Sequence, residues 1–404
     1  MEIIKEYSIT APKGFLASGV HCGLKKNRKD LALIYSEVLA VTSAVYTKNL
    51  VKGAPLLVTK DHLRDGLSKG IIINSGNANT CNGKRGITDA YKMTSLISKE
   101  LNLKSSDILV ASTGVIGVPL DIEKIELKAK DLVSSLSKLG SSDAASAIMT
   151  TDTIKKEFGV SFSIDENIVT IGCISKGSGM IEPNMGTMLS FITTDINIEK
   201  KLLDEALKEA VNETYNRVTV DGDTSTNDMV IIMANGLSKN PKITKKDEDY
   251  YNFLDMLKIV TLNQAKLIAK DGEGATKLIS CTVTGAKTVK DCVKLSKSVI
   301  KSSLVKTAFF GSDANWGRVA CALGYANIPF DTEKLDIYFK SSKGEILLCS
   351  KGEAVDFNED NARNILVDDE ILIIVNLGAY NTSATCYGCD LTYDYVKING
   401  DYRS

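Results

Sequence analysis

A Gly- and Pro-containing segment in the middle of the chain separates two runs of residues that are typical of β-strands. The segment reads Lys176-Gly-Ser-Gly-Met-Ile-Glu-Pro-Asn-Met-Gly-Thr-Met-Leu189, and the strand-like runs cover 168–174 and 188–194. A Thr hydroxyl becomes a good nucleophile when a base takes its proton, and cutting the preceding peptide bond supplies one, the α-amine of the Thr itself. Gly186 suits such a cut before Thr187, because a residue without Cβ enters strained backbone conformations. The alternative interpretation is an ordinary strand–loop–strand connection.

Strand-like and helix-like runs alternate along the rest of the chain, which predicts a mixed α and β fold whose sheet order cannot be read from the sequence. Helical spacing of apolar residues predicts helices over 90–101, 122–136 (with Gly140 marking the far end), 203–210 and 253–268. Strands are predicted at 71–73, 107–111 and 229–233, and again at 278–284, 335–339 and 371–375 in a strand-richer region from about residue 280. The polar segments 74–83 and 221–228 are predicted to form loops, turns and buried polar networks.

Composition excludes several classes of function. The 49 basic and 50 acidic residues give a net charge of −1, so no electrostatic footprint for nucleic acid is present. The basic run 25–29 is interpreted as a solvated loop. Aliphatic runs such as 371–375 are of strand length, and the first residues lack the pattern of a signal peptide, so we expect no membrane association and a cytoplasmic location. Nine scattered Cys suit reduced thiols, and the single CxxC, Cys386 to Cys389, has no His nearby, so no metal site is expected.

The chain contains only two histidines, His21 and His62. Two histidines offer few candidates for a Ser-His-Asp triad or a His-based metal site. We expect both histidines to be structural or surface residues. If Thr187 is a nucleophile, its base must come from elsewhere, which again indicates its own amine.

Several further motifs occur in a fixed order along the chain. They are 11–15 (Ala-Pro-Lys-Gly-Phe), 30–33, 74–79 (Asn-Ser-Gly-Asn-Ala-Asn), 112–117 (Ser-Thr-Gly-Val-Ile-Gly), 149–153 (Met-Thr-Thr-Asp-Thr), 221–228 (Asp-Gly-Asp-Thr-Ser-Thr-Asn-Asp), 271–277 (Asp-Gly-Glu-Gly-Ala-Thr-Lys), 311–318 and 389–399. With the segment 176–189, this ordered set resembles the ornithine acetyltransferase (glutamate N-acetyltransferase) family. The family usually has Ala where this chain has Gly186, a conservative difference that still permits self-cleavage.

The resemblance implies an architecture. The family has an αββα layered sandwich, cut into two intertwined chains around one active site. Here these would be an α chain, 1–186, and a β chain, 187–404, and the resemblance implies an α2β2 heterotetramer.

The resemblance also implies roles for individual residues. Thr187 would be the nucleophile in both self-cleavage and acetyl transfer, and Thr113 and Gly114 would form the oxyanion hole. The residues implied in substrate binding are Thr153, Lys176, Thr187, Glu273, Asn399 and Ser404. The repeated Thr in 150–153 leaves the choice among Thr150, Thr151 and Thr153 open. Ser404 stands where the family often ends in Thr-Thr.

The reaction implied is a ping-pong transfer in arginine biosynthesis, from N2-acetyl-L-ornithine to L-glutamate through an acetyl-Thr187 intermediate, without a prosthetic group. One alternative is a bifunctional enzyme that also uses acetyl-CoA to acetylate glutamate. A second is a self-cleaving aminopeptidase or amidase, with water as the acceptor, and a third is a non-catalytic binding protein.

Overall fold

The computed structural model describes residues 1–182 and 188–401, which form two compact units. Of the described residues, unit 1 comprises 1–177, 188–216 and 224–264, and unit 2 comprises 178–182, 217–223 and 265–401. Each unit therefore contains residues from both sides of the predicted cleavage position. The division of the chain at 186/187 is accordingly not a division between compact units.

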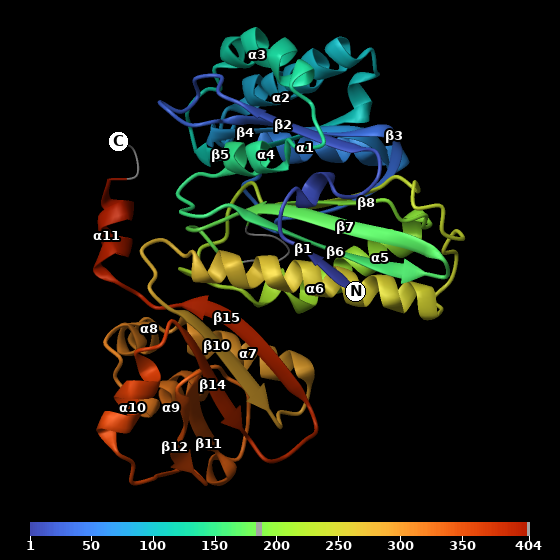
Figure 1. Cartoon of the computed structure of the whole chain (residues 1–404). Coiled ribbons are helices and arrows are strands. Elements are labelled where there is room, and N and C mark those ends of the chain that lie inside the picture. Colours follow the sequence, from blue (N-terminus) through green and yellow to red (C-terminus); the bar gives the residue numbers. More distant parts are fainter. Residues whose placement is uncertain (183–187, 402–404) are drawn as a thin grey trace. The chain divides into compact units, whose positions relative to one another are not determined.

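Unit 1 is built from nine strands and from helices on both sides of them (Figure 1). The strands are β1 (Glu2–Ile4), β2 (Phe15–Val20), β3 (Leu31–Tyr46), β4 (Leu67–Asn77), β5 (Ile108–Val115), β6 (Lys156–Ile164), β7 (Asn167–Lys176), β8 (Leu189–Thr194) and β9 (Met229–Ala234). The helices are α1 (Ala54–His62), α2 (Gly83–Leu101), α3 (Ile122–Ser134), α4 (Ser141–Ile148), α5 (Lys200–Glu213) and α6 (Glu248–Lys270), the last of which ends in unit 2.

The long strand β3 joins two layers of strands. Its first part pairs with β2 and β4, the register then shifts, and its last part, from Val41, pairs with β9. The strands run in the order β1-β6-β7-β8-β9-β3-β4-β5. Figure 1 shows the β2–β5 layer facing the β6–β8 layer, with α2 and α3 outside the first and α5 and α6 outside the second. This arrangement confirms the predicted αββα sandwich for unit 1.

The apolar runs of the central strands explain why both faces are covered. In β4, Ile71 and Ile73 belong to the core cluster that also contains Phe191 of the other layer, whereas Ile72 packs with Met93 of α2. Successive side chains of a strand point to opposite faces, so a continuous Ile run fits only a strand buried on both sides. Burial of each such side chain contributes roughly 1.5–3 kcal/mol.

Unit 2 contains a six-stranded sheet in the order β13-β12-β11-β14-β10-β15. Its strands are β10 (Leu278–Thr284), β11 (Asp336–Ser341), β12 (Gly344–Ser350), β13 (Glu353–Ala354), β14 (Glu370–Asn376) and β15 (Ser383–Cys389). Its helices are α7 (Val289–Lys301), α8 (Ser303–Phe310), α9 (Trp316–Gly324), α10 (Glu359–Leu366) and α11 (Tyr393–Gly400). The β10–β14 pair is parallel and its neighbours are antiparallel.

Two local predictions need correction, and one helix was not predicted. The segment beginning at Asn74 was expected to be a loop, but β4 continues to Asn77, because its polar residues pair with β5 as far as Val115. The predicted helix 122–136 ends at Ser134. A separate helix, α4, was not predicted, because its sequence, Ser-Ser-Asp-Ala-Ala-Ser-Ala-Ile, offers few large apolar residues to mark a helical period.

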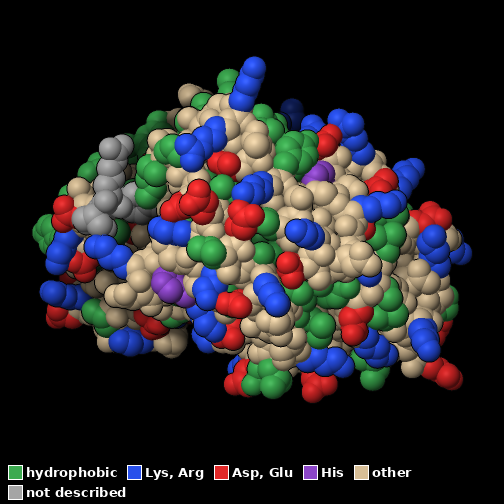
Figure 2. Space-filling view, turned by 90° about the horizontal axis from the view of Figure 1, so that it is seen from above, with side chains coloured by type: hydrophobic (Ala, Val, Ile, Leu, Met, Phe, Trp, Pro, Cys, Tyr) green, Lys and Arg blue, Asp and Glu red, His purple; other side chains and the backbone are tan. Residues whose placement is uncertain are grey.

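The surface carries mixed charge. Figure 2 shows Lys and Arg side chains interspersed with Asp and Glu over the face in view. Among the described residues, several exposed charges form ion pairs, such as Lys92–Glu126 at 2.6 Å and Lys340–Glu345 at 2.8 Å. Exposed pairs of this kind contribute little to stability. Among residues 1–182 and 188–401, no helix is long and apolar enough to span a bilayer.

Candidate active site

Thr113, Gly114 and Lys176 lie at the ends of two strands of unit 1. Thr113 and Gly114 are near the end of β5, and Lys176 is the last residue of β7. The Lys176 Nζ donates to the Thr113 Oγ1 at 3.3 Å, although 63 positions separate the two residues. Lys176 is only 8% exposed, so a cation is held inside the protein beside the predicted oxyanion hole.

Gly114 occupies a place that only glycine fits. Its φ is +135°, and an added Cβ would lie 2.3 Å from the carbonyl carbon of Gly76 and 2.4 Å from the Asn77 nitrogen. The close approach follows from the parallel pairing of β4 with β5, in which Gly76 stands opposite Gly114. Two glycines at one level of neighbouring strands therefore allow the backbone conformation that the predicted oxyanion hole uses.

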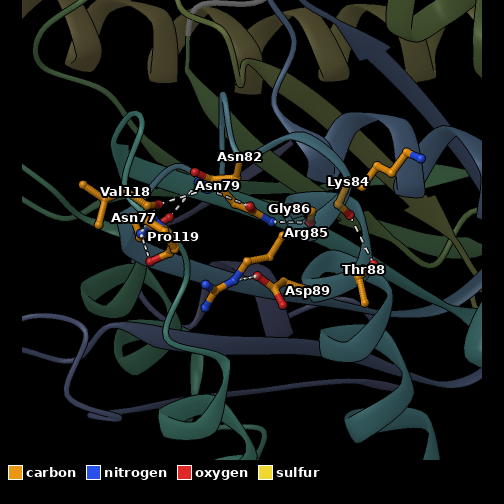
Figure 3. Close-up of polar contacts among 10 residues, drawn as sticks. All are labelled: Asn77, Asn79, Asn82, Lys84, Arg85, Gly86, Thr88, Asp89, Val118 and Pro119. Carbon is orange, nitrogen blue, oxygen red and sulfur yellow. Dashed lines mark hydrogen bonds and ion pairs between the residues drawn. The ribbon is translucent and has the colours of Figure 1, made fainter.

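The loop after Gly114 is held by asparagine side chains (Figure 3). Asn77 Nδ2 donates to the carbonyls of Val118 and Pro119, at 3.0 and 3.3 Å, and Asn82 Nδ2 donates to the Val118 carbonyl at 3.0 Å. Asn79 accepts from Asn82 and donates to a carbonyl in the first turn of α2. Asn77 of the motif 74–79, together with Asn82, thus satisfies the Val118 and Pro119 carbonyls of this loop.

Asp152 is the counter-charge of the site. It is 3% exposed, accepts from Lys156 Nζ at 2.7 Å and accepts from the Gly177 N–H at 2.7 Å. Burial alone would raise the pKa of the Asp152 carboxyl. The ammonium groups of Lys156 and Lys176 and the Gly177 N–H outweigh burial, so this pKa lies well below its ordinary range. Asp152 is therefore a permanent anion next to the predicted substrate-binding Lys176.

Asp228 has the opposite character. It is 3% exposed, and its Oδ2 has no hydrogen-bond partner in the described part of the chain. Burial raises the pKa of the Asp228 carboxyl well above its ordinary value, against the opposing effects of a hydrogen bond with Ser225 and the charge of Lys176. Two carboxyl groups with pKa values pushed apart therefore flank one lysine, an arrangement that is common at catalytic sites. The sequence interpretation of 221–228 included buried polar groups, and Asp228 is one; the sequence did not indicate its raised pKa.

The segment 149–153 is held by the basic run near the N-terminus. Lys25 Nζ donates to the Met149 carbonyl at 2.9 Å, and Arg28 donates to the Thr150 carbonyl at 3.1 Å. Lys25 is half-buried, and burial, followed by the charge of Arg28, lowers its pKa to about 8. The interpretation of the run as a solvated loop was therefore wrong for Lys25. Thr153 is exposed.

Glu273 and Asn399 come together in unit 2. Glu273 is 6% exposed and accepts from Asn399 Nδ2 at 2.8 Å. The Glu273 N–H donates to the Ser178 carbonyl at 3.0 Å, and an added Cβ on Gly179 would lie 2.2 Å from the Glu273 Oε2. The Lys176–Leu189 signature therefore continues into unit 2, where its Ser-Gly step packs against Glu273.

Three predicted site residues, Gly186, Thr187 and Ser404, lie outside the described residues. The strand that follows Thr187 is described. The Met188 carbonyl accepts from the Met229 N–H at 3.0 Å, and Leu189 pairs with Lys176 on one side and with Met229 on the other. The roles predicted for these three residues stay predictions.

Neither histidine contacts the residues of this site that the structure describes. His62 is buried, with its Nδ1 2.8 Å from the Ile108 carbonyl, and His21 is exposed, near Asp30 and the Arg28 carbonyl. Cys386 and Cys389 are buried free thiols. No group of three or more His, Cys, Asp or Glu in residues 1–182 and 188–401 is arranged to hold a metal ion.

Comparison with known proteins places the chain in a family. The sequence profile of the ArgJ family matches residues 16–404. The chain belongs to the ArgJ family. Two relatives are named arginine biosynthesis bifunctional protein ArgJ or ArgJ 1. The protein from Caldanaerobacter subterraneus subsp. tengcongensis is 51% identical over 404 residues, covering 100% of both chains. The protein from Clostridium acetobutylicum is 49% identical over 405 residues, covering 100% of this chain and 99% of the relative.

A solved structure supports the fold. The arginine biosynthesis bifunctional protein ArgJ from Bacillus halodurans is 47% identical to this ArgJ family chain, with a TM-score of 0.51. The match covers 53% of this chain and 99% of that one.

Proposed function

We propose that this ArgJ family chain transfers the acetyl group of N2-acetyl-L-ornithine to L-glutamate in arginine biosynthesis. The observation that carries the proposal is the contact between Lys176 and Thr113 in a chain that matches ArgJ relatives over its whole length. The buried ammonium group of Lys176 and the hydroxyl of Thr113, which precedes Gly114, are groups that can stabilise the oxyanion of an acyl transfer.

The proposed cycle uses two half-reactions. The Thr187 hydroxyl attacks the acetyl carbonyl, ornithine leaves with the proton that the hydroxyl gave up, and the acetyl group remains as an ester on Thr187. The amine of glutamate then attacks that ester and restores the hydroxyl. The α-amine of Thr187, freed by cleavage of the Gly186–Thr187 bond, carries the proton in both directions.

We assign substrate binding to Lys176, Thr153, Glu273, Asn399 and Ser404. Lys176 suits a substrate carboxylate, and Glu273 suits the amino group of ornithine, because each offers the opposite charge in a nearly buried position. No prosthetic group takes part in the proposed cycle. The proposed assembly is an α2β2 heterotetramer, which the native mass of the purified protein tests.

One assay separates the proposed reaction from its alternatives. Purified protein is given glutamate with N-acetylornithine, glutamate with acetyl-CoA, or N-acetylornithine in water alone. Formation of N-acetylglutamate in the first arm supports the proposal, and formation in the second arm as well identifies the bifunctional enzyme. Free acetate in the third arm at the rate of the first would indicate an amidase instead. No product in any arm would leave a binding protein.

Mass spectrometry tests the intermediate directly. Brief exposure to N-acetylornithine without glutamate should leave one acetyl group on Thr187. Thr187→Ala should carry none and should remain uncut, whereas Thr187→Ser should retain part of both reactions because it keeps a hydroxyl. An acetyl group on a Cys instead would contradict the mechanism.

A further inference from the structure

Asn227, in the motif 221–228, has an amide whose hydrogen-bonding capacity is filled. The side chain is 4% exposed. Its Nδ2 donates to the Ala78 carbonyl at 2.6 Å and to the Ser112 carbonyl at 3.0 Å. Its Oδ1 accepts from the hydroxyls of Thr80 and Thr226. Both N–H donors and both acceptor positions are thus in use.

One of these bonds acts on the predicted oxyanion hole. The Ser112 carbonyl and the Thr113 N–H belong to the same peptide group, which is planar. A donor that fixes the direction of the Ser112 carbonyl therefore also fixes the orientation of the Thr113 N–H. The amide has little room to move, because an added Cβ on Gly53 would lie 2.6 Å from its Nδ2 and Oδ1.

The same short segment reaches the strand that follows the predicted nucleophile. Two residues after Asn227, the Met229 N–H donates to the Met188 carbonyl at 3.0 Å, and Met229 pairs with Leu189 in the parallel β8–β9 ladder. Residues 227–229 therefore connect β8 to the peptide group before Thr113 through two hydrogen bonds. The distance between these two parts of unit 1 is fixed by three consecutive residues.

We propose that Asn227 is a positioning residue for acyl transfer, which holds the Ser112–Thr113 peptide at a fixed place relative to β8. The proposal rests on the proposed function, since the peptide group that Asn227 fixes leads directly into Thr113 of the predicted oxyanion hole. Asn227 acts through that peptide group. Misplacement of a catalytic group by about 1 Å can cost about 10²-fold in rate.

The chain supplies a matched control for this role. Asn240 is 2% exposed, donates to the carbonyls of Asn197 and Pro241, and accepts from the Asn197 N–H and the Ser238 hydroxyl. Like Asn227, its side chain donates two hydrogen bonds to carbonyls and accepts two, but it lies beyond the other ends of β8 and β9. Loss of the Asn227 amide leaves two buried carbonyls without these donors, and loss of the Asn240 amide does the same to two partly buried ones, so both changes should lower stability.

The experiment compares Asn227→Ala and Asn227→Asp with Asn240→Ala and Asn240→Asp in the full chain. Melting temperature, the fraction of cut chain, and kcat and KM for N-acetylornithine are measured for each. Asn227→Asp tests the donors, because a carboxylate would face two carbonyl oxygens while still accepting from Thr80 and Thr226. Asn227→Ala removes that repulsion and serves if the Asp variant fails to fold.

The expected result is a loss of about 10–100-fold in kcat for the Asn227 variants, at nearly unchanged KM. The Asn240 variants should keep a kcat close to that of the wild type even where their melting temperatures are as low as those of the Asn227 variants. Failure of cleavage in Asn227→Ala alone, with Asn240→Ala cut normally, would also support the proposal. If the two positions lose stability equally and kcat stays within twofold of wild type in both, Asn227 is merely structural. A wild-type protein without acetyl transfer would instead defeat the proposed function, so the two failures are distinguishable.

Discussion

Gly114 shows how a single residue determines whether the predicted oxyanion hole can exist. Its missing side chain lets β4 and β5 approach at the level of Gly76, and its positive φ turns the backbone out of the ordinary strand conformation. Neighbouring Gly117 also has a positive φ, +78°, but an added Cβ there meets nothing within 4 Å. The two glycines therefore separate the effect of close packing from that of backbone conformation.

We expect Gly114→Ala to lower kcat by about 10²-fold or more and to destabilise the protein by about 1–3 kcal/mol, because the strands must separate to admit the methyl group. Gly117→Ala should cost only its backbone strain and retain most of the activity. Steady-state kinetics and thermal melting of the two variants measure the difference. Equal losses of kcat in both would show that close packing at Gly114 has no special role.

Asp228 gives a prediction about pH. Because the folded-state pKa is raised, the contribution of this carboxyl to stability is full below its unfolded pKa of about 3.9 and is lost as the pH rises toward the folded pKa. Asn at this position has no such titration. Asp228→Asn should therefore gain in melting temperature relative to wild type as the pH is raised from 4 to 8.

The matched control for this prediction is Asp204→Asn, which removes a partly exposed carboxylate paired with Lys200. The melting temperature of Asp204→Asn should not rise relative to that of the wild type as the pH is raised. Melting curves at several pH values decide the question. An Asp228→Asn variant that becomes less stable than wild type as the pH rises would show that Asp228 is ionised and paired in the folded protein.

At the scale of elements, the segment 178–182 of unit 2 brings the signature next to the predicted binding carboxylate. Glu273→Gln keeps the shape of the side chain and its bond to Asn399 but removes the charge. We expect KM for N-acetylornithine to rise about tenfold or more, since a hydrogen bond to a charged group is worth about 1.5–3 kcal/mol. Asn399→Ala should have a smaller effect on KM, because it leaves the carboxylate in place.

Gly179→Ala provides an independent test of the same contact. Its methyl group would meet the Glu273 carboxylate, so it should raise KM in the same direction as Glu273→Gln. Kinetics of the double variant should show no further rise if both changes act on one carboxylate. Fully additive effects would show that Gly179 and Glu273 act separately.

Elements with a clear period could be predicted from the sequence. The Ile run of β4, the apolar stripe of α2 and the strand 278–284 all form as expected, because local burial decides them. The order of strands could not be predicted, since β3 pairs with β2 and β4 along one part and with β9 along the other. That arrangement depends on a register shift within one strand, which leaves no mark in hydrophobic alternation.

The site divides in the same way. The structure describes Thr113, Gly114, Lys176, Glu273 and Asn399, whose roles were implied by the resemblance to the ornithine acetyltransferase family. Asp228 and Asn227 were interpreted as part of structural turns and buried polar networks, because the family that the chain resembles needs no metal. Their roles depend on burial and on partners more than 100 positions away, as with Asn227 and Ser112. Lys25 was missed for a similar reason, since a run of basic residues gives no sign that one of them is half-buried.

At the scale of the whole molecule, the predicted cut falls between two strands that are neighbours in one sheet. β7 precedes residue 186 and β8 follows it, yet the two strands pair over six residue positions from Ile171 to Lys176. Cleavage at Gly186–Thr187 would therefore leave a sheet whose neighbouring strands belong to different chains.

We expect the fragments 1–186 and 187–404 to elute together in native size-exclusion chromatography and to separate only in denaturant. N-terminal sequencing of the second fragment should begin Thr-Met-Leu-Ser. An intact chain alone in purified, active protein would contradict cleavage, and separate elution in native buffer would contradict the shared sheet. Thr187→Ala provides the uncut control.

The pairing of β7 with β8 has a consequence for how the protein can be made. In the uncut chain, the two strands find each other within one molecule, at a cost in loop entropy that depends only on the length of the connection. After the cut, the same pairing becomes an encounter between two molecules, so refolding depends on protein concentration. A denatured, cut sample should therefore recover slowly on dilution, whereas uncut Thr187→Ala should refold at a rate independent of concentration. The protein would therefore fold efficiently only as the uncut precursor, and the separated fragments would regain the folded state poorly.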